Sequence, residues 1–187
     1  DRIRSDLYAY PRHEALGMAA KIKLNLPSSL WTARDSARLG MDTLAAIKLR
    51  TSKGLDANGK RFKRYSIKPL YVAFKGARLK PKGGRLSRTG RSIYYKRGYA
   101  QYKAESRRVG RGSSALVDLV ASGALMNNLV LKEATKHRFV IGLTANVAHY
   151  GYAVNADREY LGLSPRDVNV LVSAVQAELT KKIRGRR

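Results

Sequence analysis

The sequence of 187 residues contains no cysteine. Disulfides, thiolate zinc sites, iron–sulfur clusters and cysteine nucleophiles are therefore excluded for these residues, and the absence fits a reducing compartment. Long apolar runs are also missing, since no stretch approaches the roughly 18 consecutive apolar residues of a membrane span. The opening stretch lacks the apolar core of a signal peptide. We accordingly expect no membrane partner.

Acidic residues are scarce relative to basic ones. The chain has 13 Asp and Glu against 38 Lys and Arg, which gives a formal net charge of +25. Such a charge points to partners such as nucleic acid, an anionic membrane surface or an acidic protein. The excess is concentrated in residues 60–111, which hold 18 Lys and Arg and a single acid, Glu105.

Patterns typical of catalysis are missing as well. The three histidines, His13, His137 and His149, show neither H-x-x-x-H nor H-E-x-x-H spacing, and no G-x-S-x-G motif occurs. The carboxylates are scattered and form no convincing acid/base pair along the sequence. We therefore expect no enzymatic activity, no metal and no cofactor.

One stretch raises a specific question about nucleotide binding. Residues 54–60 read G-L-D-A-N-G-K, which is close to the G-x-x-x-x-G-K-[ST] pattern of a phosphate-binding P-loop. A P-loop follows a strand and opens a helix. This stretch instead follows a predicted helix, and Arg61 replaces the Ser or Thr that would hold magnesium. The sequence favours a turn over Asp56–Gly59, because Asp and Asn bond their own backbone and Gly accepts a positive φ.

A long helix is predicted over residues 29–53. Ser29 is the expected cap, and Asp35 lies near the positive end of the helix dipole. Gly54 follows the last turn, where glycine is the preferred residue. The apolar residues at spacings of three and four, which predict the buried face, are Leu30, Ala33, Ala37, Met41 and Leu44.

A second helix is predicted at the end of the sequence. It starts at a capping box formed by Ser164 and Asp167, with Pro165 at the first helical position. The residues of its expected apolar face are Val168, Leu171, Val172, Val175, Leu179 and Ile183. The last residues, 181–187, are expected to fray.

Short strands are predicted over residues 115–143, with a break at Ser122-Gly123. The stretches N-L-V-L-K-E-A and H-R-F-V-I-G-L are expected to pair as an antiparallel hairpin across residues 135–137. Residues 15–26 are ambiguous, because their apolar spacing fits a helix while I-K-L-N-L alternates like a strand. We favour a short helix there.

The segment 60–111 is predicted to be an extended basic arm or hairpin, because its Gly-containing middle cannot bury much apolar area. A short helix bearing Tyr99 and Tyr102 is expected near its end. Either the arm docks on acidic neighbours, or it binds nucleic acid and stacks Tyr94, Tyr95, Tyr99 and Tyr102 on bases. The candidate contact residues are Arg78, Lys80, Lys82, Arg85, Arg88, Arg91, Lys96 and Arg97.

The order of these elements predicts an α+β fold. Helices, a basic arm, strands and a final helix follow one another, without the alternation typical of a wound parallel sheet. The length suits a single domain over residues 1–187. Within it we distinguish an N-terminal segment, residues 1–28, and the arm, residues 60–111.

Several motifs together resemble the virion-morphogenesis family of tailed phages, which contains small tail-completion or head–tail joining proteins of the neck. A Gly-x-Asp-x-x-Gly-x-x-Phe turn follows a long helix, and an Arg-x-Tyr-Leu-Gly-Leu-Ser stretch leads into the last helix. The segments that carry the resemblance are G-L-D-A-N-G-K-R-F-K-R-Y-S, G-Y-A-Q-Y-K, V-D-L-V-A-S-G-A-L-M-N-N-L-V-L, F-V-I-G-L, H-Y-G-Y-A-V-N and R-E-Y-L-G-L-S-P-R-D-V-N-V-L. The resemblance covers about residues 30–183, and the basic insert around 76–97 departs from the pattern.

The resemblance implies a structural protein of the virion, assembled in the host cytoplasm, with a long helix packed on a small antiparallel sheet. Such proteins form homo-oligomeric rings between the portal or adaptor complex and the tail-tube or terminator proteins. The ring surrounds the channel for genomic DNA, which the arm's cations would contact without reading sequence. In the turn before the last helix, Arg158 would pair with a neighbour's carboxylate, Tyr160 and Leu161 would be packing anchors, and Gly162 would complete the turn.

Two other hypotheses stay open at this point. The first is a non-enzymatic nucleic-acid-binding protein that uses the Tyr-containing basic block, although the sequence has no named nucleic-acid-binding signature. The second is a small nuclease, which would need a cluster of carboxylates or histidines around a metal, and the sequence offers none.

Overall fold

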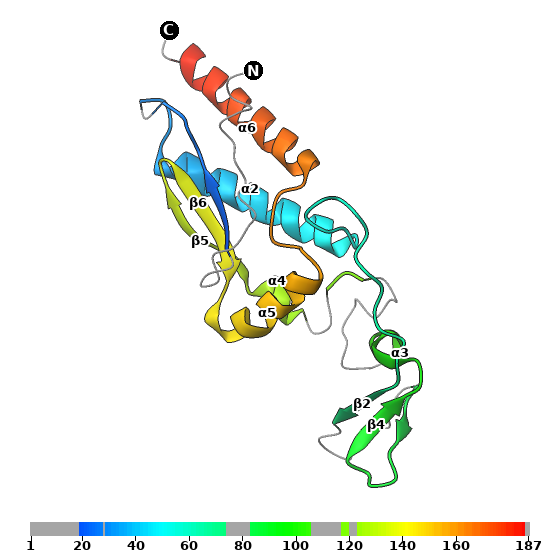
Figure 1. Cartoon of the computed structure of the whole chain (residues 1–187). Coiled ribbons are helices and arrows are strands. Elements are labelled where there is room, and N and C mark those ends of the chain that lie inside the picture. Colours follow the sequence, from blue (N-terminus) through cyan, green and yellow to red (C-terminus); the bar gives the residue numbers. More distant parts are fainter. Residues whose placement is uncertain (1–18, 28, 74–82, 106–116, 120–122, 186–187) are drawn as a thin grey trace.

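The computed structural model has an α+β fold, which confirms the predicted fold class (Figure 1). It describes residues 19–27, 29–73, 83–105, 117–119 and 123–185. The strands are β1 (Ala19–Lys23), β2 (Leu70–Ala73), β3 (Arg85–Leu86), β4 (Ser92–Tyr95), β5 (Leu129–Thr135) and β6 (Arg138–Leu143). The helices are α2 (Ala33–Ser52), α3 (Gly98–Glu105), α4 (Ala124–Asn127), α5 (Ala145–Asp157) and α6 (Pro165–Arg184).

Two antiparallel sheets lie in different parts of the molecule (Figure 1). The larger sheet has the strand order β1–β6–β5, and helix α2 packs on it as the resemblance implies. Helix α6 lies beside α2, and α4 and α5 lie near the end of the sheet. We call these elements the body. Its hydrophobic core joins the sheet and the helices, with Ile22, Ile47, Phe139 and Ile141 fully or almost fully buried.

The second sheet, with the strand order β2–β4–β3, forms a projection together with α3 (Figure 1). We call residues 65–73 and 83–105 the arm. Strands β3 and β4 pair as a hairpin, and α3 bears Tyr99 and Tyr102. The predicted hairpin and short helix are therefore confirmed within the described part of the segment 60–111.

Helix α2 starts later than the sequence indicated. Its N-cap is Thr32, whose hydroxyl accepts from the backbone N–H of Asp35 while the Asp35 carboxylate accepts from the backbone N–H of Thr32. The predicted cap, Ser29, instead lies in a turn in which the carbonyl of Pro27 accepts the next two backbone N–H groups. The end was predicted correctly, since Gly54 adopts a φ of +76° after the last turn.

The buried face of α2 also differs from the expected one. Met41 is 55% exposed, although it belonged to the predicted apolar stripe. The face against the sheet carries small residues, Ser36, Gly40 and Thr43, and a Cβ at Gly40 would lie only 2.6 Å from Leu131 Cδ1. The helix approaches the sheet through these small side chains, so close packing decides the orientation rather than apolar spacing alone.

The N-terminal helix prediction was wrong for residues 19–23. These residues form the edge strand β1, which pairs antiparallel with β6. The alternating pattern prevailed because Ile22 and Leu24 point into the core while Lys21 and Lys23 stay exposed. The rest of the predicted helix before residue 19 lies outside the described residues.

The middle of the sequence contains one further correction. Residues 124–127 form a short helix, α4, where short strands were expected, because Gly123 turns the backbone with a φ of +80°. The hairpin prediction was correct, since β5 and β6 pair antiparallel from Thr135↔Arg138 onward.

The last helix matches its prediction at the start and departs from it at the end. The capping box of Ser164 and Asp167 is present, and Leu171 and Val175 are buried. Ile183, expected on the apolar face, is half exposed. The helix continues to Arg184 instead of fraying from residue 181.

The core packing gives a direct test of the fold. We expect Ile141→Ala, at a fully buried position of β6, to lower the free energy of unfolding by about 2–5 kcal/mol, because a cavity adds to the lost transfer free energy. Chemical denaturation with fluorescence or circular-dichroism detection measures this change.

Ile67→Ala is the matched control, because Ile67 is 73% exposed. This variant is expected to stay within about 0.5 kcal/mol of the parent. Equal losses in the two variants would contradict the placement of β6 in the core.

Candidate functional site

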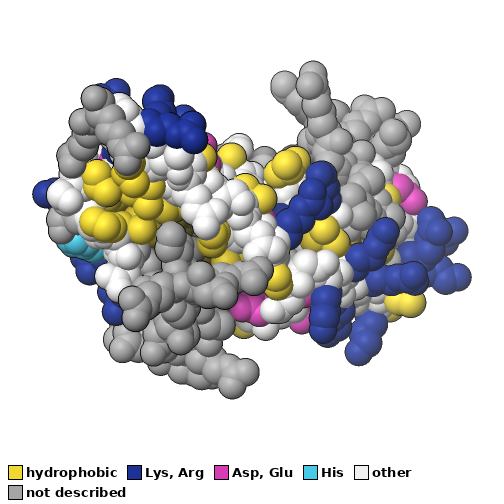
Figure 2. Space-filling model, turned by 90° about the horizontal axis from the view of Figure 1, so that it is seen from above, with side chains coloured by type: hydrophobic (Ala, Val, Ile, Leu, Met, Phe, Trp, Pro, Cys, Tyr) yellow, Lys and Arg dark blue, Asp and Glu magenta, His cyan; other side chains and the backbone are white. Residues whose placement is uncertain are grey.

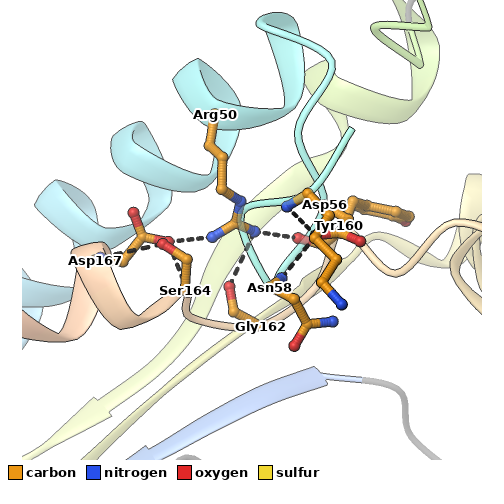
Figure 3. A network of polar contacts seen from close by, with 8 residues as sticks. Arg50, Asp56, Asn58, Tyr160, Gly162, Ser164 and Asp167 are labelled. Carbon is orange, nitrogen blue, oxygen red and sulfur yellow. Dashed lines mark hydrogen bonds and ion pairs between the residues drawn. The ribbon is translucent and has the colours of Figure 1, made fainter. Parts of the chain in front are cut away.

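A buried arginine joins three elements of the body (Figure 3). The guanidinium of Arg50, in the last turn of α2, is only 6% exposed. One terminal nitrogen pairs with the carboxylate of Asp167 at the start of α6. The other donates to the carbonyl of Tyr160 at 2.8 Å and to the carbonyl of Gly162 at 3.1 Å. We call this set of contacts the Arg50 junction.

The carboxylate of Asp167 has two roles in the Arg50 junction. Besides pairing with Arg50, it accepts from the backbone N–H of Ser164 at 2.9 Å. The hydroxyl of Ser164 in return accepts from the backbone N–H of Asp167 at 3.2 Å. The start of α6 is thereby tied to the end of α2, and the buried cation has both an ionic partner and carbonyl acceptors, as a buried charge requires.

The stretch that resembles a P-loop is a turn packed on this junction. The carboxylate of Asp56 accepts from the backbone N–H groups of Asn58 and Lys60, each at 2.8 Å. Gly59 adopts a φ of +77°. The prediction of a turn is confirmed, and the backbone N–H groups that a P-loop would offer to phosphate are bonded within the chain.

This turn contacts the segment before the last helix. The backbone N–H of Ala57 donates to the carbonyl of Glu159 at 2.7 Å. Gly162 has a φ of +149°, and a Cβ there would lie 3.0 Å from that of Ala57. Two motifs that carry the family resemblance, about 100 residues apart in sequence, thus pack directly on each other (Figure 3).

The residues singled out before the last helix are all engaged within their own chain. Tyr160 is fully buried and its hydroxyl donates to the carbonyl of Gly151 at 3.3 Å, while burial raises the pKa of that hydroxyl far above its usual range. The side-chain oxygen of Asn155 accepts from the backbone N–H groups of Tyr160 and Leu161 at 3.0 and 2.8 Å. These contacts fix the turn.

Arg158 also bonds inside the chain. Its guanidinium donates to the carbonyls of Lys63 and Arg64 at 3.3 and 3.4 Å and pairs with the carboxylate of Asp157. It also lies over the ring of Tyr65, 5.4 Å from the ring centroid. The pairing with a neighbouring subunit's carboxylate therefore stays a prediction, whereas these intrachain contacts are present in the structure.

A second buried ion pair joins the arm to residues 117–119, of which Val117 packs in the hydrophobic core of the body. Lys103 of α3 is fully buried, pairs with the carboxylate of Asp118 and donates to the hydroxyl of Tyr65 at 3.1 Å. Burial raises the pKa of the Tyr65 hydroxyl to about 12, and the Asp118 carboxylate acts in the same direction. We call these contacts the Lys103 junction. It joins two further segments of the resemblance, G-Y-A-Q-Y-K and V-D-L.

Most of the tyrosines that were candidates for base stacking contact one another inside the arm. Ring centroids lie 5.4 Å apart for Tyr95 and Tyr102, 5.6 Å for Tyr102 and Tyr99, and 5.0 Å for Tyr99 and Tyr65. This chain of rings runs from the β2–β4–β3 sheet to the Lys103 junction, and it stabilises the arm internally. Tyr94 is outside the chain and contacts Tyr71 instead.

The arm carries the exposed positive charge predicted for it. Figure 2 shows Lys and Arg side chains gathered toward one end of the molecule in the view from above. Arg97 pairs with the carboxylate of Glu105. The candidate contacts Arg78, Lys80 and Lys82 lie outside the described residues. The candidates with exposed side chains are Arg85, Arg88, Arg91, Lys96 and Arg97.

A cavity of about 500 Å³ lies where the arm meets the body. Its ionisable groups include Asp157 and Arg158, which pair with each other. The remaining lining is mainly aromatic and apolar and includes Tyr65, Tyr99, Leu119, Leu125 and Tyr150. The cavity therefore presents mainly apolar surface.

The described residues contain no group of three or more His, Cys, Asp or Glu side chains arranged to hold a metal ion. Among the helices that the structure describes, none is long and apolar enough to cross a membrane. His137 and His149 are exposed, and His13 lies outside the described residues.

Sequence reasoning missed the residues at the centre of both junctions. Neither Arg50 nor Lys103 was singled out, although both are buried. Their partners, Asp167 and Asp118, lie 117 and 15 residues further along the chain. Tyr71, an exposed aromatic of β2, was also not singled out. In a chain with so many cations, composition does not distinguish a buried cation from an exposed one.

Comparison with known proteins adds no relative. The chain matches no protein-family model, no curated protein and no solved structure. The function is therefore inferred from the residue patterns, the two junctions and the exposed surface of the arm.

The Arg50 junction predicts a large and specific loss of stability. We expect Asp167→Asn to lower the free energy of unfolding by about 3–5 kcal/mol, because Arg50 then keeps a buried charge without its counter-ion. Chemical denaturation measures the change.

The control is Glu133→Gln, which removes a half-exposed ion pair with Arg138. It is expected to cost less than about 1 kcal/mol. A loss of that small size in Asp167→Asn would contradict the assignment of Arg50 as a buried charge held by Asp167.

The Lys103 junction predicts a local effect. We expect Asp118→Asn to speed amide hydrogen exchange in α3 and to leave α2 close to the parent, because the substitution uncouples the arm while the core stays packed. Hydrogen exchange followed by mass spectrometry resolves the two helices. The control is Asp157→Asn, at an exposed carboxylate. Equal acceleration in α2 and α3 would mean that Asp118 supports the whole fold instead of the arm.

Proposed function

We propose that the protein is a structural component of a tailed-phage virion. In this role it is one subunit of the neck ring that joins the portal or adaptor complex to the tail around the DNA channel. The main support is that the motifs that resemble the family contact one another at the Arg50 junction and at the Lys103 junction. Segments that suggested the family from sequence alone are the segments that hold α2, α6 and the arm together.

The way these residues are used favours a structural role over catalysis. The Asp56–Gly59 turn, Tyr160 and Asp167 bond to other parts of the same chain. Such contacts define shape and leave few polar groups at the junctions for a substrate. A protein whose function is assembly needs this kind of rigid body with contact surfaces around it.

The arm fits the contacts that a ring subunit makes. A subunit in a closed ring uses two different surfaces, one for each neighbour, and closes by rotation. An arm that projects from the body can reach a neighbouring subunit. Its cations attract acidic partners, which speeds their association and fixes the position in which they dock. Portal or adaptor proteins on one side and tail-tube or terminator proteins on the other are the partners of this proposal.

The second candidate function is nucleic-acid binding without a ring. It is favoured by the exposed cations of the arm together with the exposed ring of Tyr71. In a neck ring the same surface would face genomic DNA or an acidic neighbour. The two functions differ in whether contact with nucleic acid requires assembly.

The oligomeric state tests the proposal. We expect light scattering of the nuclease-treated protein in high salt to give a closed oligomer, a fixed multiple of 20.8 kDa, whose mass does not grow with concentration. High salt and nuclease remove assemblies held together by bound nucleic acid.

A chain that stays monomeric at every concentration and binds duplex DNA tightly at moderate salt would contradict the ring and favour the second candidate. An open series of masses that increases with concentration would contradict closure, because a heterologous contact that does not close gives filaments.

A further inference from the structure

The β2–β4–β3 sheet of the arm has an outer row of three side chains. Strand register places Tyr71 of β2 opposite Tyr94 of β4, and Tyr94 opposite Arg85 of β3. Residues directly opposite each other in a sheet project from the same face. The neighbouring residues of β4, Ile93 and Tyr95, project from the other face and are buried.

Helix α3 covers the inner face of this sheet. The ring of Tyr102 in α3 contacts the ring of Tyr95, and the side-chain amide of Gln101 donates to the carbonyl of Gly83 at 2.7 Å. The helix therefore supports the sheet from one side. The outer row faces away from this support, and Tyr71 is 64% exposed.

Tyr71 and Tyr94 form an aromatic surface on the outer face. Their ring centroids lie 4.9 Å apart with an interplanar angle of 44°. Leaving a large aromatic ring mostly in water gives up the stabilisation that burial would bring. The inner tyrosines of the arm already stabilise it, so this pair is available for contact with a partner.

Exposed cations lie in the row of the aromatic pair and in the chain segments next to it. Arg85 completes the row, Arg88 and Arg91 lie in the connection between β3 and β4, and Lys96 follows β4 directly. All four side chains are exposed. The only acidic residue in the arm is Glu105, which pairs with Arg97. The outer face thus combines flat rings with cations and has no carboxylate in its row.

We propose that this outer face binds a single strand of nucleic acid, with the cations on its phosphates and Tyr71 and Tyr94 stacked on its bases. Cations on a surface with interleaved aromatic rings are the combination that single strands recognise, since each base has an open π-face. An acidic protein would use the charge and leave the rings without a role. A duplex would meet the same cations through its phosphates, while its bases stay stacked on one another.

This inference rests on the nucleic-acid contact named under the proposed function, both for the second candidate and for an arm that faces the channel. It specifies which residues of the arm make that contact and which form of nucleic acid they bind. It does not require a ring. Assembly is measured by mass and binding by anisotropy, so failure of the neck proposal and failure of this surface are separate results.

The test is fluorescence anisotropy with two labelled probes of equal length, a thymine oligonucleotide and a mixed-sequence duplex, over a series of salt concentrations. The variants are Tyr71→Ala, Tyr71→Phe and Arg85→Ala. Tyr150→Ala is the matched tyrosine control, because Tyr150 is an exposed tyrosine of α5 in the body. Arg34→Ala is the matched cation control, at an exposed position of α2. Thermal unfolding verifies that each variant is folded.

We expect Tyr71→Ala to weaken binding of the single strand by about fivefold or more and binding of the duplex by less than about twofold, because a duplex keeps its bases stacked. Tyr71→Phe keeps the ring and is expected to bind like the parent. Arg85→Ala is expected to lower the salt slope by about one unit on both probes, because one phosphate contact is lost.

Three results would overturn the inference. Equal effects of Tyr71→Ala and Tyr150→Ala on the single strand would mean that the aromatic pair takes no part in binding. Equal effects of Arg85→Ala and Arg34→Ala would mean that binding follows total charge and not this face. If no variant binds either probe differently from the parent, the outer face is a protein contact instead.

Discussion

The buried guanidinium of Arg50 is the contact on which the arrangement of the body depends. It connects the end of α2 with the carbonyls of Tyr160 and Gly162 and with the carboxylate at the start of α6. A cation inside a protein is costly unless it is paired and hydrogen-bonded, as the two terminal nitrogens of Arg50 are. The final helix, the turn before it and the long helix are therefore fixed together, and α6 is held alongside α2.

The Lys103 junction applies the same constraint to the arm. A fully buried lysine pairs with Asp118 and bonds Tyr65, and the chain of tyrosine rings continues from there into the β2–β4–β3 sheet. The arm is attached at one end and presents its other surface outward (Figure 1). In our proposal the body is a rigid framework, and the arm offers partners its exposed cations and the exposed ring of Tyr71.

Local chemistry could be predicted from the sequence, and distant pairing could not. The capping box of Ser164 and Asp167, the turn at Asp56–Gly59 and the β5–β6 hairpin follow from neighbouring residues, and all three are present. The roles of Arg50 and Lys103 depend on carboxylates elsewhere in the chain, so neither propensity nor spacing revealed them. The face of α2 was misjudged because small residues, not the largest apolar ones, allow close approach to the sheet. Strand β1 was misjudged because its pairing with β6 outweighs a weak helical pattern.

The central claim is that the body is a framework and the arm is the contacting element. Hydrogen exchange of the whole protein, with and without a thymine oligonucleotide, tests this claim most directly. The account predicts added protection in β2 and β4 and in the connection between β3 and β4, with α2 and α6 unchanged. Protection that appears on α2 or α6 and spares the arm would contradict it, because the contact surface would then belong to the body.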